Sequence, residues 1–149
     1  MKEGSTDCLF CKIIRGEEKC RKLYENEGAL GILDIGQVFG MDGEIIPGRC
    51  LVISKRHVRH YHDLEDEEAG QLFIAAKALA NKIKRAFNPE FVTIFIRGQR
   101  VPHVHIILQP STEGDPVDSI FRQVRQYFKV APDDLLDEIA QKISQGGKG

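Results

Sequence analysis

The chain has 149 residues, 42% hydrophobic and 29% charged, and its formal net charge at pH 7 is −1. A chain of this length buries roughly 68–70% of its unfolded surface, so it can hold a core without disulfide bonds. The near-neutral charge excludes a general attraction to nucleic acid or anionic membranes. No apolar run reaches the roughly 20 residues of a membrane helix, and no signal-peptide core begins the chain, so we expect a cytoplasmic protein with nuclear access by diffusion.

The first expected elements are a short helix and a β-hairpin. Asp7 is expected to cap the helix, because a carboxylate accepts the free backbone N–H groups of a first turn, and Gly16 is expected to end it. Residues 22–25 and 29–35 then have the composition of two strands. The turn between them, at 26–28, contains Asn and Gly, which tolerate positive φ.

The short helix carries Cys8 and Cys11 as a Cys-x-x-Cys pair. In an intracellular chain this spacing indicates a metal site or a redox pair, and two buried thiols are the plainer alternative. Zinc requires four ligands, and spacing alone does not supply the other two. Cys20 and Cys50 follow no partner pattern, so we interpret both as free thiols.

Residues 36–48 contain four glycines and a proline, which predicts a loop long enough to serve as a functional flap. Its apolar side chains would be costly to leave in water. We therefore expect them to pack over a pocket or against a second subunit, or to belong to a mobile lid. They are Val38, Phe39, Met41, Ile45 and Ile46.

The middle of the chain predicts a third strand at 49–54 and one long helix at 66–87. Apolar residues recur in the helix at intervals of three and four. They are Ala69, Leu72, Phe73, Ala76, Leu79, Ala80, Ile83 and Phe87. Two more strands, at 91–96 and 103–109, complete the order of an α+β fold with an antiparallel sheet. Helices are expected in the tail, at 119–128 and 132–143.

The strand at 103–109 carries the most informative residues. Strand side chains alternate between faces, so His103, His105 and Ile107 lie on one side, and the apolar residues between them form a core face. A single histidine in such a strand is usually a core residue with a satisfied hydrogen bond. Two histidines at i and i+2, next to Gly98 and Gln99, favour a functional site.

This stretch resembles the signature of the histidine-triad (HIT) family, Gly-Gln-x-Val-x-His-φ-His-φ-His-φ-φ, in which φ is apolar. The matching residues are Gly98, Gln99, Val101, His103, Val104, His105, Ile106 and Leu108. Ile107 occupies the position of the third histidine. Three other segments occur in the order found in the family: Asp7–Gly16, Leu33–Ile35 and Pro47–His57.

The resemblance implies an architecture for the whole chain. We expect a HIT-like α+β fold, in which an antiparallel five-stranded sheet carries one long helix and a short N-terminal helix. The HIT domain is expected over residues 7–112, and a C-terminal helical extension over 113–149 is expected to pack on the same domain. Family members usually pair through the long helix and a strand, which implies a homodimer.

The resemblance also implies a structural zinc ion. Zinc-carrying members use the two cysteines, the histidine after the Lys-x motif and the first triad histidine. The corresponding residues here are Cys8, Cys11, His57 and His103. His60 and His62 match no ligand position, and we expect both at the surface.

In the family, the histidine at the position of His105 attacks the α-phosphorus of a nucleotide derivative, and water then hydrolyses the nucleotidyl-histidine. Asp34 matches the acid that binds the ribose hydroxyls, although it also suits a turn at the end of a strand. Gln99 and Arg100 are expected near the phosphate. The expected partner is a purine mononucleotide or nucleotide conjugate, and neither nucleic acid nor a membrane is expected.

Four departures from the family pattern bear on activity. Ile107 lacks the donor of a third histidine, and Arg49 replaces the histidine usual after Pro-Gly. Arg100 replaces a small hydroxyl residue, and the link at 96–98 is several residues short and lacks an amide side chain. The two arginines are either substitute phosphate ligands or solvated surface charges.

Two readings of the chain follow from this pattern. The first is a hydrolase acting on purine nucleoside phosphoramidates or related nucleotidyl conjugates. The second is a catalytically impaired, zinc-containing nucleotide-binding or adaptor protein. A thiol redox protein built on the cysteine pair is a third alternative, but no thioredoxin-like sequence surrounds that pair.

Overall fold

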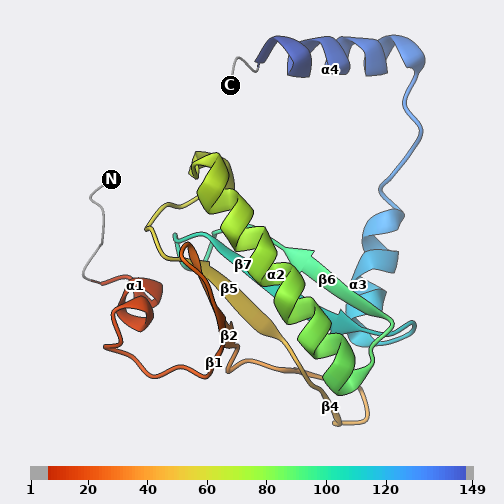
Figure 1. Ribbon diagram of the computed structural model, residues 1–149. Coiled ribbons are helices and arrows are strands. Elements are labelled where there is room, and N and C mark those ends of the chain that lie inside the picture. Colours follow the sequence, from red (N-terminus) through yellow and green to blue (C-terminus); the bar gives the residue numbers. More distant parts are fainter. Residues whose placement is uncertain (1–6, 147–149) are drawn as a thin grey trace. The chain divides into compact units, whose positions relative to one another are not determined.

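The structure is a computed structural model that describes residues 7–146 (Figure 1). The chain divides into two compact units, Met1–Asp118 and Ser119–Gly149. The first unit contains the whole sheet and the long helix. Among the described residues, no helix combines the length and the apolar character needed to cross a membrane.

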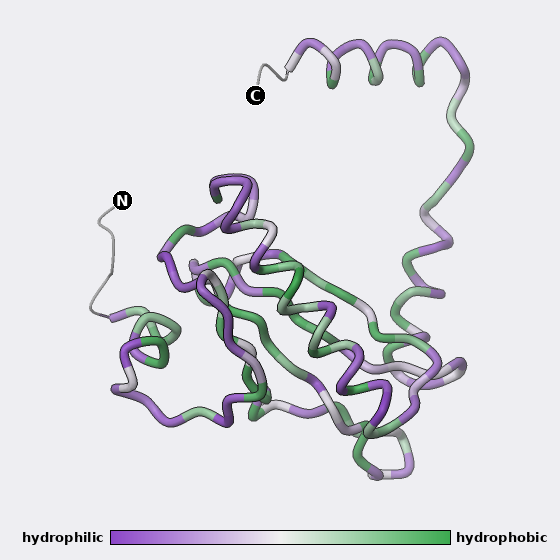
Figure 2. Tube along the Cα trace, in the orientation of Figure 1, coloured by the Kyte–Doolittle hydropathy of each residue, from purple (hydrophilic) through white to green (hydrophobic). Residues whose placement is uncertain are grey.

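The first unit is built on a five-stranded sheet in the order β1-β2-β5-β7-β6, and all neighbouring strands are antiparallel. The strands are β1 (Lys22–Glu25), β2 (Ala29–Leu33), β5 (Cys50–Ser54), β6 (Phe91–Phe95) and β7 (His105–Ser111). The predicted α+β class and the five-stranded antiparallel sheet are therefore confirmed. Figure 2 shows hydrophobic residues running along β5 and β7 in the middle of the sheet.

The long helix α2 (Asp66–Phe87) has the predicted bounds and packs on one face of the sheet. A capping box between Glu65 and Glu68 begins it, and Asn88 ends it with a left-handed φ of 48°. Its buried residues are Leu72, Ala75, Ala76, Leu79 and Ile83. Phe73 and Phe87, which belong to the predicted apolar repeat, are 43% and 51% exposed, because they lie at the edges of the apolar stripe.

The opposite face of the sheet packs against the short helix α1 (Leu9–Ile14). Along β5, Cys50 and Val52 belong to the core beneath α2, whereas Leu51 and Ile53 belong to a second cluster with α1. The N-cap of α1 is Cys8 and no side chain within residues 7–146 caps the helix, so the predicted Asp7 cap is wrong. Gly16 follows the helix with φ of 76°, as expected for a left-handed helix end.

The β1–β2 turn has a different cause from the one predicted. Neither Asn26 nor Gly28 has a positive φ. Instead, the Asn26 Oδ1 atom accepts hydrogen bonds from the backbone N–H groups of Gly28 and Ala29, at 3.0 and 2.8 Å. The turn is therefore held by a side-chain acceptor that satisfies two backbone donors.

Residues 36–48 form a small hairpin rather than an irregular loop. Its strands are β3 (Val38–Phe39) and β4 (Ile45–Ile46). The Gln37 side chain holds the base, since its Oε1 atom accepts from the backbone N–H groups of Gly48 and Arg49. Phe39 and Met41 are 59% and 99% exposed, so the expected packing over a pocket is wrong for these residues. Packing against a second subunit stays a prediction.

The tail, as far as residue 146, contains two helices, α3 (Pro116–Arg125) and α4 (Asp133–Gly146). α3 begins three residues before the predicted position, and its first residues belong to the first compact unit. No residue of α4 is buried. The predicted packing of residues 113–149 on the HIT domain stays a prediction.

Candidate metal centre and neighbouring histidine

Four side chains from distant parts of the chain meet on the α1 face of the sheet. Their ligand atoms all lie within 4.8 Å of one another, and three of the four residues are buried. They are Cys8, Cys11, His57 and His103. Cys8 is the N-cap of α1 and Cys11 lies within the helix, whereas the segments after β5 and before β7 supply the histidines. The structure thus brings together all four residues that the family resemblance assigned to zinc.

The spacing of the donor atoms fits a tetrahedral zinc ion. Bond lengths of about 2.3 Å to sulfur and about 2.0–2.1 Å to nitrogen imply separations of about 3.5 Å between S and N and about 3.3 Å between two N atoms. The Cys8 Sγ to His103 Nδ1 distance is 3.4 Å, and the Cys11 Sγ to His57 Nδ1 distance is 3.2 Å. The two Nδ1 atoms are 3.1 Å apart. Four converging donors at these separations are suited to a closed site.

His103 is oriented for ligation by a hydrogen bond on its other nitrogen. Its Nε2 atom donates to the backbone oxygen of Ser54 at 2.7 Å, which directs the basic Nδ1 atom into the cluster. Burial lowers the pKa of His103 to about 4, so the ring is neutral at pH 7. Burial and the neighbouring Cys8 raise the pKa of the Cys11 thiol to about 11. A bound cation would offset this and stabilise the thiolate.

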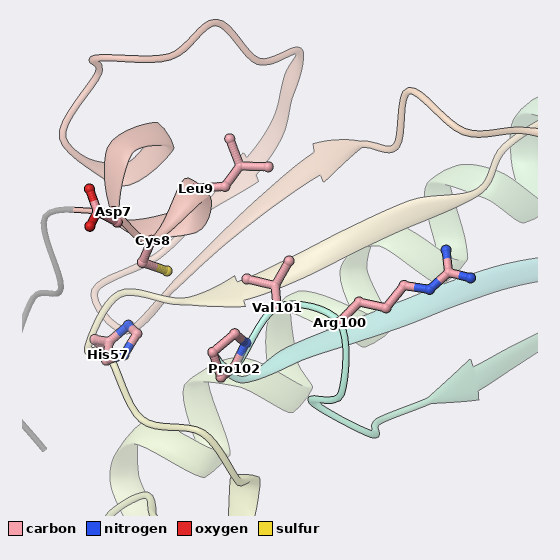
Figure 3. A pocket seen from close by; sticks show the side chains of 7 residues that line it. All are labelled: Asp7, Cys8, Leu9, His57, Arg100, Val101 and Pro102. Atoms are coloured by element: carbon pink, nitrogen blue, oxygen red, sulfur yellow. The ribbon is translucent and has the colours of Figure 1, made fainter.

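A pocket of about 350 Å³ borders this cluster (Figure 3). Its lining residues are Asp7, Cys8, Leu9, His57, Arg100, Val101 and Pro102. In Figure 3 the guanidinium group of Arg100 points away from Cys8 and His57. Of the four residues predicted to bind the nucleotide, Arg100 lines this pocket. Asp34, Gln99 and His105 do not.

His105 lies beside the metal cluster, at the start of β7. Its Nδ1 atom is 2.7 Å from the backbone oxygen of His103, a distance that requires an N–H at Nδ1. When the ring carries no proton on Nε2, its basic lone pair therefore lies on that atom. The side chain is half-buried, and its ring meets the ring of Phe10 edge-on with centroids 4.9 Å apart. Such an imidazole is fixed in one tautomer and is partly accessible.

The pairing of β2, β5 and β7 places further residues on the face that carries His105. Two cross-strand rows follow from the register, Leu30–Ile53–His105 and Ile32–Leu51–Ile107. Beyond them, one more step of two residues along each strand brings together Asp34, Arg49 and Gln109. This polar row lies four residues along β7 from His105, about 13 Å by strand rise. Ile107 and its neighbours form an apolar floor between the two polar ends.

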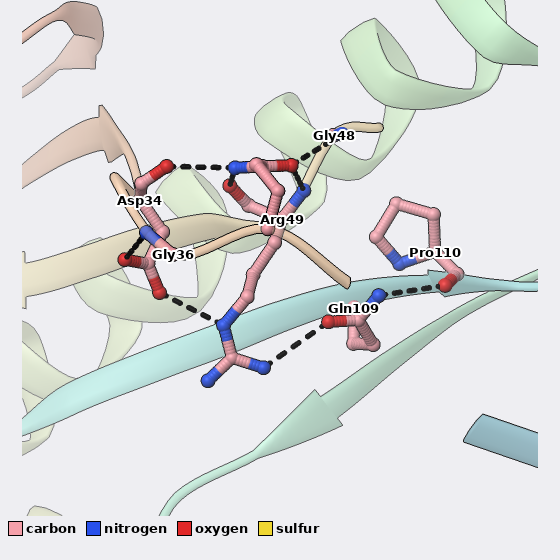
Figure 4. A network of polar contacts seen from close by, with 7 residues as sticks. Asp34, Gly36, Gly48, Arg49, Gln109 and Pro110 are labelled. Carbon is pink, nitrogen blue, oxygen red and sulfur yellow. Dashed lines mark hydrogen bonds and ion pairs between the residues drawn. The ribbon is translucent and has the colours of Figure 1, made fainter. Parts of the chain in front are cut away.

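The polar row is held by Arg49 (Figure 4). Its Nε atom donates to Asp34 Oδ2 at 2.8 Å, and its Nη1 atom donates to Gln109 Oε1 at 3.1 Å. The Asp34 Oδ1 atom accepts from the Gly36 backbone N–H. Arg49 is therefore an ion-pair partner of Asp34, not a solvated surface charge. A carboxylate has about four acceptor sites, so about two remain for a ligand.

Three residues of this face were missed by sequence reasoning. Phe10 stands between the two cysteines, and Gln109 continues the i, i+2 pattern of His105 and Ile107, so both had a usable signal. Ser54 contributes its backbone oxygen, which no sequence pattern reveals. His60 and His62 stack on each other, with ring centroids 5.1 Å apart, and do not belong to the cluster.

The fold and these motifs define a HIT-domain protein. The HIT domain model matches residues 15–111, and the chain belongs to the HIT family. Among curated relatives, "Protein hit" of Bacillus subtilis is 33% identical over 93% of this chain and 95% of its own length. Adenosine 5'-monophosphoramidase hnt1 of Schizosaccharomyces pombe is 32% identical over 71% of this chain and 77% of its own. Adenylylsulfatase HINT3 of Arabidopsis thaliana is 31% identical over 76% of this chain and 58% of its own length.

Solved structures give the same family. The Streptococcus mutans protein SMU.412c superimposes with a TM-score of 0.77 at 30% identity, covering 96% of this chain and 87% of that chain. A Zn-bound histidine triad family protein from Mycobacterium smegmatis superimposes with a TM-score of 0.64 at 26% identity, covering 97% of this chain and 100% of that chain. The similar proteins thus include an adenosine 5'-monophosphoramidase, an adenylylsulfatase and a Zn-bound histidine triad family protein.

Proposed function

We propose that this protein is a nucleotide hydrolase that acts on purine nucleoside phosphoramidates or related nucleotidyl conjugates. The main support is the geometry of His105, whose Nδ1 atom is held by the His103 carbonyl so that Nε2 carries the lone pair. A fixed, neutral imidazole is what an attack on phosphorus requires. Two of the relatives are an adenosine 5'-monophosphoramidase and an adenylylsulfatase, and these two activities support the substrate class.

In the proposed reaction, the Nε2 lone pair of His105 forms a bond to the α-phosphorus while the bond from phosphorus to the leaving group breaks. The leaving group departs with that electron pair, and an amine takes up a proton from the solvent. Water then cleaves the phosphorus–nitrogen bond, which yields the nucleoside monophosphate and a neutral imidazole. One difficult displacement becomes two easier ones.

The nucleotide is proposed to extend from His105 toward Asp34. The free acceptor sites of the Asp34 carboxylate suit two adjacent ribose hydroxyls, and Arg49 holds the carboxylate in place. Gln99 and Arg100 are both exposed in the loop before β7 and are proposed to contact the phosphate. Ordering of that loop by the ligand would complete the set of donors.

The Cys8, Cys11, His57 and His103 cluster is proposed to hold a structural zinc ion that fastens α1 to the sheet. Its closed donor set, with cysteine and histidine only, supports this role over a catalytic one. A homodimer and a cytoplasmic location, with access to the nucleus, complete the proposal. Exposed apolar side chains at Phe91 and Ile94 on the edge strand β6 support pairing of two copies.

A second candidate is a zinc-containing nucleotide-binding or adaptor protein with impaired catalysis. Ile107 favours this candidate. The register makes it the next residue after His105 on the same face of β7, and a histidine at this position would offer a hydrogen-bond donor. The loss of one preorganised donor typically lowers turnover by about 10²–10³.

Turnover of a fluorogenic adenosine phosphoramidate by the wild type and by His105→Ala tests the proposal. We expect slow hydrolysis by the wild type and none above background by His105→Ala. His62→Ala is the matched control, because it removes an exposed imidazole outside the site. Equal turnover by wild type and His105→Ala would reject the nucleophile. AMP binding without any turnover would select the second candidate.

A further inference from the structure

Phe10 connects the metal cluster to His105. It lies between Cys8 and Cys11 on α1, is 5% exposed and belongs to the apolar cluster beneath that helix. Its ring meets the ring of His103 at a centroid distance of 5.8 Å and the ring of His105 at 4.9 Å, edge-on in both cases. One buried aromatic ring thus touches a candidate ligand and the candidate nucleophile.

A second connection runs through the backbone of His103. In the His103 side chain, the Nδ1 atom lies near the Sγ atoms of both cysteines, and the Nε2 atom donates to the Ser54 backbone oxygen. Its own carbonyl oxygen accepts the hydrogen bond from His105 Nδ1. A shift of the His103 backbone would therefore displace the acceptor that fixes the tautomer of His105.

α1 has little stability of its own. It has six residues and no acidic residue in its first turn, and no side chain in the described part of the chain caps its N-terminus. Isolated helices shorter than about 12–15 residues are marginal in water, so the position of α1 depends on its contacts with the sheet. Those contacts are the two cysteines of the cluster and a small apolar surface that includes Phe10.

We propose that Phe10 is a positioning residue that makes the orientation of His105 depend on occupancy of the metal centre. With the four ligands drawn together, α1 presses the Phe10 ring against the His105 imidazole, and the His103 carbonyl holds Nδ1–H. When the centre is empty, α1 loosens, and both supports of the imidazole weaken together. The importance of His105 rests on the proposed function, but its orientation can be measured without turnover.

The first test reads the His105 ring directly. Protein labelled with ¹⁵N-histidine is examined by NMR at one fixed pH, zinc-loaded and after chelation. The zinc-loaded wild type is expected to show a single Nδ1–H tautomer for His105. Chelated wild type and zinc-loaded Phe10→Ala are expected to show averaging between the two tautomers. An unchanged His105 signal in both samples would overturn the inference.

The second test separates positioning from binding. A small misplacement of reacting groups costs up to about 10²-fold in rate. We expect Phe10→Ala to lower kcat at least about ten-fold and to leave KM nearly unchanged, because substrate binding is not its role. Phe10→Leu restores bulk in the same cavity and is expected to recover most of kcat. A rise in KM alone would overturn the inference.

Lys12→Ala is the matched control. Lys12 lies on the same helix and is neither in the metal cluster nor among the residues that line the pocket, so its truncation should alter neither the tautomer nor kcat. Zinc content is measured for every variant, and Phe10→Leu serves as the test variant if Phe10→Ala loses zinc. Absence of turnover in the wild type would reject the proposed hydrolase, whereas the NMR comparison would still decide the role of Phe10.

Discussion

The two faces of the central sheet are stabilised in different ways. The face under α2 is covered by aliphatic side chains, and its largest members, such as Leu72, Leu79 and Ile106, are fully buried. The other face has a smaller apolar cluster and carries the four candidate metal ligands and His105. On the first face, many similar apolar contacts contribute to stability. On the second face, a single bound ion would join residues from three separate segments of the chain.

This difference determines how each face tolerates change. Aliphatic cores accept substitutions that conserve volume at a cost below about 1.5 kcal/mol. A tetrahedral metal centre has no such tolerance, because each ligand supplies one of four bonds. The α2 face is therefore expected to respond to substitution gradually, and the α1 face in an all-or-none way.

Removal of a metal ligand is expected to have the largest effect. Structural zinc sites contribute roughly 10–16 kcal/mol of apparent binding free energy. Cys11→Ser or His57→Ala should therefore lower Tm sharply and make thermal unfolding insensitive to a chelator. About one zinc per chain is expected in the wild type by metal analysis. No zinc in that measurement, or no effect of chelator on the wild type, would reject the four-ligand site.

Truncation in the α2 core is expected to have the next largest effect. Leu79 is fully buried between the helix and the sheet, so Leu79→Ala should cost about 2–5 kcal/mol in denaturant unfolding. The shift of Tm caused by chelator should match that of the wild type, since the metal face is intact. A loss of zinc from Leu79→Ala would show that the two faces do not act independently.

Loss of the Asp34 carboxylate is expected to weaken nucleotide binding. Hydrogen bonds from hydroxyls to a charged acceptor contribute about 1.5–3 kcal/mol, so Asp34→Ala should reduce AMP affinity about ten- to a hundred-fold in calorimetry. Arg49→Ala leaves the acceptor in place and should reduce affinity less. Equal affinity of Asp34→Ala and the wild type would exclude this residue from the nucleotide site.

The smallest predicted effect is a gain at position 107. Ile107→His adds a donor two residues from His105, and we expect it to raise phosphoramidate turnover at least about ten-fold, at the low end of the range for one donor. The same substitution in an Arg100→Ser background tests for a substitute. A gain only in that background would assign the role to Arg100. No gain in either background would show that the missing histidine does not limit turnover.

The sequence predicted the α2 face well because its contacts follow helical and strand periodicity. The bounds of α2 and the alternation along β5 depend on local pattern alone. On the other face, the four ligands lie up to 95 residues apart in sequence, so only the family motif connected them. The ion pair between Asp34 and Arg49 depends on the register of β2 and β5, which composition does not specify. The exposure of Phe73 and Phe87 depends on how widely the sheet covers α2.

The order of the ligands in the chain has a consequence for protein synthesis. Cys11 leaves the ribosome 92 residues before His103. At roughly 5–20 residues per second, this interval lasts about 5–18 s. During that time the two cysteines are present without either the strand or the last histidine that would cover them. The nascent chain therefore passes through a stage in which its thiols are open to oxidation or to capture by a competing soft metal, and the stage ends only when the segment before β7 emerges.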